Sequence, residues 1–448
     1  MTQLQSSRRK RGVVLSLKGW QRVQAAEQKA ADQDNSSRPY TLEQLSDRSG
    51  LSPNTITKVR RRRHAVDRQT LESYFGAVGL ELASEDYISL EPDSTLRSST
   101  PLRGQVPLDS PYYIERQPNE QIAYDEVMQP GALIRIKAPK QFGKTSLMAR
   151  VLAFAREKGM REAVVNFQLA DSSVFSNFDR FLRWFCAVVT RSLNLPIQLD
   201  QYWDDLYGSS YSCTNYFERY LLTEIDSPIV LALDEGDILF GHPALANDFL
   251  AMIRAWNEKA RYGNDGSDLW QQLRLVLVHC SESLIGLPLD LNQSPFNVGL
   301  SIELESFNQE QIQELIQRYG IENGSQLATE LENYLGGIPY LVQLSLHTIS
   351  TRGIAFTQIK EQSMAANSIF GFHLRNALTR LQKSHPQLLP ILYNVTTAPE
   401  PIALDPIDAF NLQCTGLVCL DTLQKAEPSC VLYQQYFSQV LPRIRDNS

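Results

Sequence analysis

Apolar runs alternate with helix-length patterns between residues 111 and 304. Five short stretches are almost wholly apolar and read as buried strands: 133–136, 163–167, 229–233, 273–279 and 299–304. Segments with helical spacing of apolar residues lie between them, at 146–152, 178–195 and 244–260. Apolar strands joined by helices are typical of a parallel sheet that helices cover on both faces. We therefore expect an α/β core over residues 111–304.

The pattern from residue 305 to residue 368 is helical. A capped amphipathic helix is expected at 308–320. Two further helices are expected on either side of Gly336-Gly337-Ile338-Pro339. Residues 305–368 are therefore predicted to form a helical lid on the α/β core.

The last 80 residues, 369–448, are predicted to form a winged-helix domain. Helical patterns at 374–383 and 386–396 precede two short apolar strands, at 415–420 and 429–433, and a final helix at 433–441. Helices followed by a β-hairpin indicate a winged helix. Its surface is not notably basic, which favours docking within the molecule over contact with DNA.

The N-terminal region, 1–83, is expected to be all-α. A long helix is predicted at 13–33, two short helices flank Gly50, and a further helix lies near 70–75. Thr41 can cap the first short helix, and Ser52-Pro53 starts the second. Residues 84–110 are rich in Ser and Pro without periodicity, so we expect a linker there.

The two short helices resemble the helix-turn-helix of phage-repressor type, in which the second helix enters the major groove. On that resemblance the residues facing bases would be Asn54, Thr55, Thr57 and Lys58. Those meeting phosphates would be Arg60, Arg61, Arg62 and Arg63. Double-stranded DNA is thus an expected partner. The alternative is a four-helix interaction module whose arginines are solvated.

Charge is distributed unevenly along a chain of otherwise ordinary composition. The chain has 43% hydrophobic and 21% charged residues and a net charge of −7. Residues 1–75 hold 15 Lys and Arg against 7 Asp and Glu, or +8, so the remainder carries −15. A basic N-terminal region joined to an acidic remainder indicates that one module, and not the whole protein, binds a polyanion.

The compartment is expected to be the cytoplasm. No apolar run reaches the length of about 18 residues that a membrane helix needs, and no signal peptide follows the basic N-terminus. The six cysteines show no Cys-x-x-Cys spacing, which favours free thiols in a reducing compartment.

The strongest chemical signal is the stretch 138–146, here called the phosphate loop. A strand, a glycine-containing loop, Lys-Thr and a helix form the layout that cradles nucleotide phosphates. The first glycine of the usual pattern is replaced by Ala138. Lys144 would contact the β- and γ-phosphates, and Thr145 would ligate Mg²⁺. The predicted nucleotide-binding residues are Ala138, Pro139, Gln141, Phe142, Gly143, Lys144, Thr145 and Ser146.

The second signal is Asp234-Glu235 at the end of an apolar strand. Asp234 would hold Mg²⁺, and Glu235 would polarise the attacking water. At the end of the next strand, Ser281 and Glu282 could touch the γ-phosphate or orient water, whereas His279 is read as a buried structural group. Arg254 is the candidate for stabilising transition-state charge, with Arg261 and Arg274 as rivals, and a surface ion pair is the alternative reading for each.

Residues 104–441 resemble the AAA-like ATPase module common in cyanobacterial proteins, within the signal-transduction ATPases with numerous domains (STAND; vWA-MoxR-associated type). The segments that carry the resemblance are 107–116, 134–148, 231–237, 292–299 and 336–341. The resemblance implies that Arg116 contributes to the nucleotide site. The Gly-x-Pro pattern that ends at Pro339 would itself let the lid backbone approach the nucleotide, and an ordinary helix stop and restart is the alternative. Family members often have a basic residue shortly after the acidic turn, and this chain has Ile238 there.

The resemblance further implies an ATP/ADP switch that is closed with ADP and can oligomerise with ATP, often in bacterial conflict or stress signalling, with a protein partner that the sequence does not identify. A slow ATPase with a DNA-binding head is the first interpretation. The alternatives are a DNA-remodelling or transposition-type ATPase that assembles on duplex DNA, and a transcriptional repressor with a nucleotide-sensing body.

Overall fold

The computed structural model describes residues 13–34, 40–62, 66–89, 104–263, 266–285, 298–322, 324–365 and 367–445. The chain divides into two compact units, Met1–Thr100 and Pro101–Ser448. Most of the predicted linker, together with residues 292–297 of one family segment, lies outside the described residues. Within these described ranges, no helix is both long and apolar enough to cross a membrane.

The first unit is a small helical head closed by two short strands. Its elements are β1 (Val13–Leu15), α1 (Leu17–Asp34), α2 (Leu42–Ser49), α3 (Pro53–Arg61), α4 (Arg68–Gly76) and β2 (Tyr87–Ser89). β1 and β2 pair antiparallel. The prediction of one helix from residue 13 is therefore wrong for its first four residues, and β2 lies within the stretch predicted as linker. Neither three-residue strand is long enough to show a period.

The turn between α2 and α3 follows from its capping residues. The Thr41 hydroxyl accepts the backbone N–H of Gln44, and the Gln44 side chain accepts that of Thr41. Gly50 ends α2 in the left-handed conformation, with φ 69°. Ser52 caps α3 ahead of Pro53. Leu45 and Ile56, both fully buried, then meet in the core of the head.

The second unit is built on a five-stranded parallel sheet in the order β4-β5-β6-β3-β7. The strands are β3 (Leu133–Ala138), β4 (Arg161–Asn166), β5 (Ile229–Asp234), β6 (Leu273–Cys280) and β7 (Leu300–Glu303). All five predicted strands are present, which confirms the α/β class. β5 and β6 are buried along their whole length because helices cover both faces.

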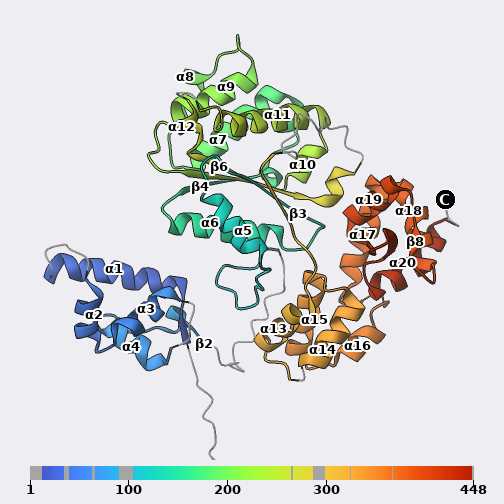
Figure 1. Cartoon of the computed structure of the whole chain (residues 1–448), viewed down its shortest axis with the longest axis horizontal. Helices are drawn as coiled ribbons and strands as arrows, with labels where there is room; N and C mark the ends of the chain where they lie inside the picture. Colours follow the sequence, from blue (N-terminus) through green and yellow to red (C-terminus); the bar gives the residue numbers. More distant parts are fainter. Residues whose placement is uncertain are drawn as a thin grey trace, which may run out of the picture. The chain divides into compact units, whose positions relative to one another are not determined.

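Two layers of helices enclose the sheet (Figure 1). α5 (Asn119–Val127) and α6 (Lys144–Glu157) cover one face. The other is covered by α7 (Phe178–Ser192), α8 (Leu199–Tyr202), α9 (Ser209–Tyr216), α10 (Asp237–Phe240), α11 (Pro243–Lys259) and α12 (Ser267–Trp270). Successive residues of a strand point to opposite faces of the sheet. Ile134 and Val276 therefore belong to one apolar cluster, and Leu133 and Leu275 belong to the other.

The lid and the C-terminal domain continue the apolar cluster of the α5–α6 face. The lid comprises α13 (Gln309–Arg318), α14 (Gly324–Leu335), α15 (Pro339–Arg352) and α16 (Phe356–Glu361). The C-terminal domain comprises α17 (Gly371–Ser384), α18 (Leu389–Thr397), β8 (Ile402–Ala403), α19 (Pro406–Thr415), β9 (Val418–Leu420), β10 (Lys425–Pro428) and α20 (Val431–Arg445).

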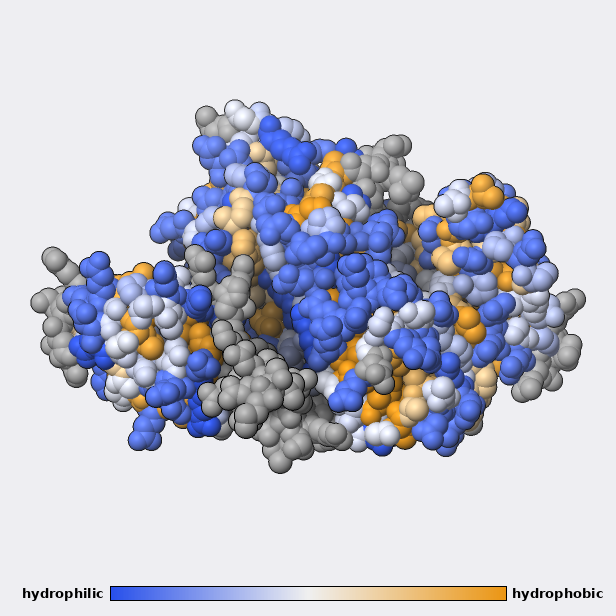
Figure 2. All heavy atoms as spheres, turned by 60° about the horizontal axis from the view of Figure 1, so that its bottom comes forward, coloured by the Kyte–Doolittle hydropathy of each residue, from blue (hydrophilic) through white to orange (hydrophobic). Residues whose placement is uncertain are grey.

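The C-terminal domain has the element order of a winged helix, with an antiparallel sheet in the order β8-β10-β9. The predicted strand at 429–433 is wrong, because β10 ends at Pro428 and α20 begins at Val431. Leu432 and Tyr433 are buried in the first turn of a helix, and a short apolar run does not distinguish that from a strand. Helix α19 was not predicted. On the face shown in Figure 2, hydrophilic residues predominate and apolar ones form small patches.

The head offers a test of its close packing at Gly19. A Cβ atom at Gly19 would lie 2.2 Å from the carbonyl oxygen of Asp86, whereas one at Gly76 would meet nothing within 4 Å. Gly19→Ala should destabilise the head by about 1–3 kcal/mol, since backbone must move. Gly76→Ala, the matched control, should be neutral or slightly stabilising. Hydrogen exchange of the α1 and β2 amides in the full chain measures both, and equal protection in the two variants would contradict the prediction.

Candidate nucleotide-binding site

The phosphate loop connects β3 to α6 in the way the sequence predicts. Gly143 precedes α6 with φ 89°, a left-handed conformation that glycine adopts without strain. Gln141 also has a positive φ, 68°, which is uncommon for a residue with a side chain. Ala138 is still in β3, paired with Cys280, so no glycine is required there. The departure from the usual motif therefore leaves the loop intact.

Lys144 lies at the first position of α6 and turns back over the loop. Its ammonium group donates to the carbonyl oxygens of Ala138 and Pro139, at 3.1 and 3.0 Å. The positive end of the α6 dipole adds to this charge. A half-buried cation beside free N–H groups at a helix N-terminus is suited to bind phosphate.

Asp234 and Thr145 meet although they are 89 positions apart in sequence. The Thr145 hydroxyl donates to Oδ1 of Asp234 at 3.3 Å. Burial raises the pKa of Asp234, while the N–H of Glu235 and the Thr145 hydroxyl act in the opposite direction. A carboxylate and a hydroxyl brought together beside a phosphate loop fit Mg²⁺, which prefers oxygen ligands completed by substrate phosphates.

The acidic turn after β5 is held in an unusual backbone conformation. Glu235 has φ 56°, and its N–H donates to Asp234 Oδ1 at 3.0 Å. Burial and the neighbouring carboxylates of Asp234 and Asp237 raise the pKa of Glu235. A carboxylate with a raised pKa in a strained turn is the setting expected of a general base.

Asp237 fixes this turn and was missed by sequence reasoning. Its Oδ1 accepts the N–H of Cys280 at 2.5 Å and the hydroxyl of Ser283 at 3.1 Å. Gly236 donates its N–H to Val278 at 3.0 Å. The turn after β5 is therefore tied to the end of β6. The sequence signal for Asp237 was its place as the third acidic residue of the stretch Asp234-Glu235-Gly236-Asp237.

The end of β6 brings Ser281 next to the phosphate loop. Cys280 pairs with Ala138, and Ser281 follows directly. The Ser281 hydroxyl is buried and has no hydrogen-bond partner in the part of the chain that the structure describes. It is therefore available to a ligand. His279 is a buried group beside Phe240, and burial lowers its pKa to about 4, in line with the structural reading.

Arg116 supports the loop from behind. Its side chain is 5% exposed and donates to the carbonyl oxygen of Phe142 at 2.7 Å. A Cβ atom at Gly143 would lie 3.0 Å from Nη2 of Arg116. The arginine beneath the loop therefore favours glycine at this position. Pro339 is buried at the start of α15.

The three arginine candidates for transition-state charge do not converge on this site. Arg254 pairs with Glu258 along α11 at 2.8 Å, which matches the alternative reading of an ion pair. Arg274 lies at the start of β6, the end of the sheet opposite the phosphate loop, and donates to Gln271. Arg261 is exposed just after α11. The expectation that Arg254 acts in this copy's site gains no support from the geometry.

Residues 101–439 match the family model of the AAA-like domain. The chain belongs to the AAA-like domain family. No curated protein matches it. Similar solved structures include the ORC2 protein of Aeropyrum pernix in ADPNP-ADP complexes, with 14% identity, 73% of this chain and 92% of that chain covered, and a TM-score of 0.42.

Two further structures are similar to this AAA-like chain at comparable levels. Cdc6p of Pyrobaculum aerophilum has 14% identity, with 75% of this chain and 97% of that chain covered and a TM-score of 0.38. AMPPCP-bound DnaA of Aquifex aeolicus has 12% identity, with 75% and 90% covered and a TM-score of 0.38.

The winged helix of this AAA-like chain lies directly against the phosphate loop. His373 of α17 places Nδ1 on the Gln141 side-chain oxygen, and its Nε2 lies 2.7 Å from the Tyr433 hydroxyl. A Cβ atom at Gly416 would approach Cβ of Pro139 to 2.6 Å. These contacts join the loop to two separate parts of the C-terminal domain, α17 and the end of α19.

A second contact reaches the neighbouring strand end. Arg380 of α17 pairs with Glu282 at 3.2 Å, and Glu282 follows the candidate residue Ser281. The C-terminal domain therefore touches both the phosphate loop and the end of β6. Sequence analysis predicted docking of this domain within the molecule, but it did not identify His373, Arg380 or Gly416.

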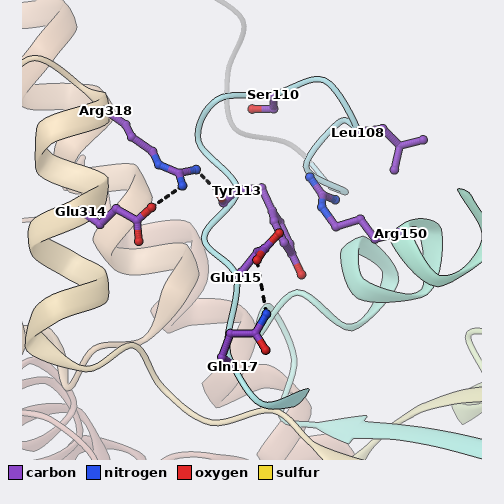
Figure 3. A pocket seen from close by; sticks show the side chains of 8 residues that line it. All are labelled: Leu108, Ser110, Tyr113, Glu115, Gln117, Arg150, Glu314 and Arg318. Atoms are coloured by element: carbon purple, nitrogen blue, oxygen red, sulfur yellow. Dashed lines mark hydrogen bonds and ion pairs between the residues drawn. The ribbon is translucent and has the colours of Figure 1, made fainter. Parts of the chain in front are cut away.

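A strap over residues 104–118 crosses between α6 and the lid (Figure 3). Arg150 of α6 lies 3.3 Å above the ring of Tyr113 and donates to the carbonyl oxygens of Val106 and Pro107. Arg318 of α13 holds the Pro111 carbonyl oxygen at 2.9 Å. A cavity of about 400 Å³ remains between these groups. The strap thus links the phosphate-loop helix to the lid.

The predicted DNA-facing residues of the head differ in their exposure to solvent. Asn54 and Lys58 are exposed, and Thr55 and Thr57 are half-buried. The prediction that Arg60 meets DNA phosphates is corrected. Arg60 donates to the Tyr74 hydroxyl at 2.8 Å and to Glu27 at 2.7 Å, so its charge is used within the head. Arg62 ends α3 in the left-handed conformation. The side chain of Arg61 and all of Arg63 lie outside the described residues.

The contact between His373 and the loop predicts a pH dependence. Burial, with the charge of Arg380, lowers the pKa of His373 to about 4. Because the unfolded chain takes up this proton near pH 6.5, stability is full above pH 6.5 and falls toward pH 4, by up to about 1.4 kcal/mol per pH unit. His373→Gln should lose less melting temperature than wild type between pH 7 and pH 5. An identical loss in both proteins would exclude His373 as the cause.

Proposed function

We propose that the chain is an ATP-dependent molecular switch that hydrolyses ATP slowly. The observation that carries the proposal is the convergence of Lys144, Thr145 and Asp234, from two separate strand ends, on one side of the phosphate loop. Lys144 and the α6 N-terminus would hold the phosphates. Thr145 and Asp234 would hold Mg²⁺, which when bound neutralises charge on the phosphate oxygens.

The proposed hydrolytic residues are Glu235 and Ser281. Glu235 would accept the proton of the attacking water, and Ser281 would orient that water or the terminal phosphate. The strained backbone of Glu235 and the buried hydroxyl of Ser281 support these roles. Because Arg254 is paired within its own helix, an arginine from a neighbouring copy is the proposed source of transition-state charge.

The contact of the winged helix with the phosphate loop supports a switch over a continuously working motor. A nucleotide that adds or loses a phosphate at this loop would change the fit of Gln141 against His373. Binding free energy is then used to choose between arrangements of the lid and winged helix. In this proposal hydrolysis resets the arrangement, and the ATP form is the one that self-associates. A signalling role, as in STAND ATPases, belongs to the same proposal.

Calorimetry on three single variants tests the nucleotide site. Lys144→Ala should reduce ATP affinity by at least 100-fold, since it removes the phosphate-binding charge. Lys140→Ala changes an exposed lysine of the same loop and should leave affinity within about 2-fold. Glu235→Gln should keep ATP affinity and lose hydrolysis. Equal affinities for the two lysine variants would refute the phosphate-loop assignment.

The head is proposed to bind duplex DNA through α3. The capped turn between α2 and α3 and the exposure of Asn54 and Lys58 support a recognition helix. Arg62 and Arg61, at the end of α3, would contribute phosphate contacts. Since Arg60 is held by Glu27 and Tyr74, its proposed role is to fix α3 against α1 and α4.

The salt dependence of DNA binding tests the head. Lys58→Ala should lower the slope of log affinity against log salt by about 1, because one phosphate contact is lost. Arg68→Ala is the matched control, as Arg68 lies exposed on α4 and pairs with Glu72. An unchanged slope for Lys58→Ala, measured by fluorescence anisotropy with duplex DNA, would leave the head as a protein-binding module.

A further inference from the structure

A rigid loop on the α7–α9 layer exposes large apolar side chains. We define the aromatic knob as Leu206, Tyr207 and Tyr211, which are 83%, 61% and 54% exposed. The rings of Tyr207 and Tyr211 lie 4.9 Å apart, so they form one continuous surface. The knob lies above the sheet in Figure 1, on the face opposite α5 and α6. It is therefore separate from the phosphate loop, which opens α6.

The knob is fixed from below by Asp179 of α7. Asp179 accepts hydrogen bonds from Trp203 and Ser209, both at 2.9 Å, and from Arg183 at 2.8 Å. Although burial acts the other way, these bonds hold the pKa of Asp179 below its usual value, so it stays charged. One carboxylate thus holds both ends of the loop that carries Leu206 and Tyr207.

A second set of contacts fixes the same loop from within. The Arg183 guanidinium lies 4.5 Å from the centre of the Trp203 ring and reaches Asp205 at 3.3 Å. The Ser212 hydroxyl donates to the carbonyl oxygen of Asp204 and accepts its N–H. Apolar groups on a flexible loop could fold away from water, but these groups are held outward.

The charge around the knob is mainly negative, and the Arg183 guanidinium that reaches the loop is paired with Asp179 and Asp205. From Ser192 to Glu218 the chain has four acidic residues and no lysine or arginine. Asp204 and Asp205 directly precede Leu206 and are exposed. The knob is therefore an apolar projection with an acidic collar.

We propose that the aromatic knob is a docking site for a different protein that offers an apolar hollow rimmed by lysine or arginine. Pre-positioned Tyr and Leu side chains lose little freedom on binding and are typical anchors of protein interfaces. The acidic collar would repel the phosphates of nucleic acid, and its charge is complementary to a partner surface rimmed by lysine or arginine. Exposed apolar surface on a loop held this firmly is typical of interaction sites.

Photo-crosslinking from the knob identifies the partner and tests the proposal. A benzophenone amino acid replaces Tyr207 in the full chain, expressed in its source cells, and the crosslinked peptide is sequenced by mass spectrometry. The expected adduct is to another protein, at an apolar segment flanked by Lys or Arg. Adducts only to a second copy of this chain, or none above the level of an unirradiated sample, would overturn the proposal.

Affinity for the purified partner then tests the chemistry. Leu206→Asp should weaken binding at least 10-fold, and the wild-type affinity should fall with added salt because the acidic collar contributes to binding. Leu423→Asp is the matched control, because Leu423 is 73% exposed on the turn between β9 and β10. Unchanged ATP affinity in all variants shows that the core is folded. Equal loss in Leu206→Asp and Leu423→Asp would overturn the proposal.

Discussion

The register of the parallel sheet is the constraint on which the candidate site depends. Ala138 of β3 lies opposite Cys280 of β6, and β5 lies next to β6 on its other side. Because parallel strands end at one edge, the phosphate loop, the acidic turn and Ser281 are brought together by backbone pairing alone. A shift by one residue would turn every side chain to the opposite face and separate Asp234 from Thr145.

The remaining parts of the second unit are arranged around this edge. Arg116 donates a hydrogen bond to the phosphate loop, and the strap that contains Arg116 is hydrogen-bonded to Arg150 of α6 and Arg318 of α13. The winged helix contacts the loop through His373 and Gly416, and the residue after the end of β6 through the ion pair of Arg380 with Glu282. The core and the winged helix therefore contact the loop directly, and the strap connects the loop to the lid. A change in that loop can reach all three.

The sequence predicted most of the fold and the centre of the site, for identifiable reasons. Long apolar runs specify buried strands, and the phosphate loop places Lys144 and Thr145 by local geometry. The β1–β2 pair, α19 and the start of α20 were missed or misread because they are short or their apolar runs have no clear period. Contacts such as His373 with Gln141, 232 positions apart, depend on domain packing that no local pattern contains. Arg60 was misassigned because a cluster of arginines does not reveal which member has a half-buried carboxylate nearby.

Gly416 shows how such packing constrains the chain as it evolves. Its conformation, φ 73°, favours glycine, and even a methyl group there would press on Pro139. Any larger side chain at this position would push the winged helix and the loop apart. The proposed balance between the two arrangements would then shift, although no residue of the candidate nucleotide site has changed.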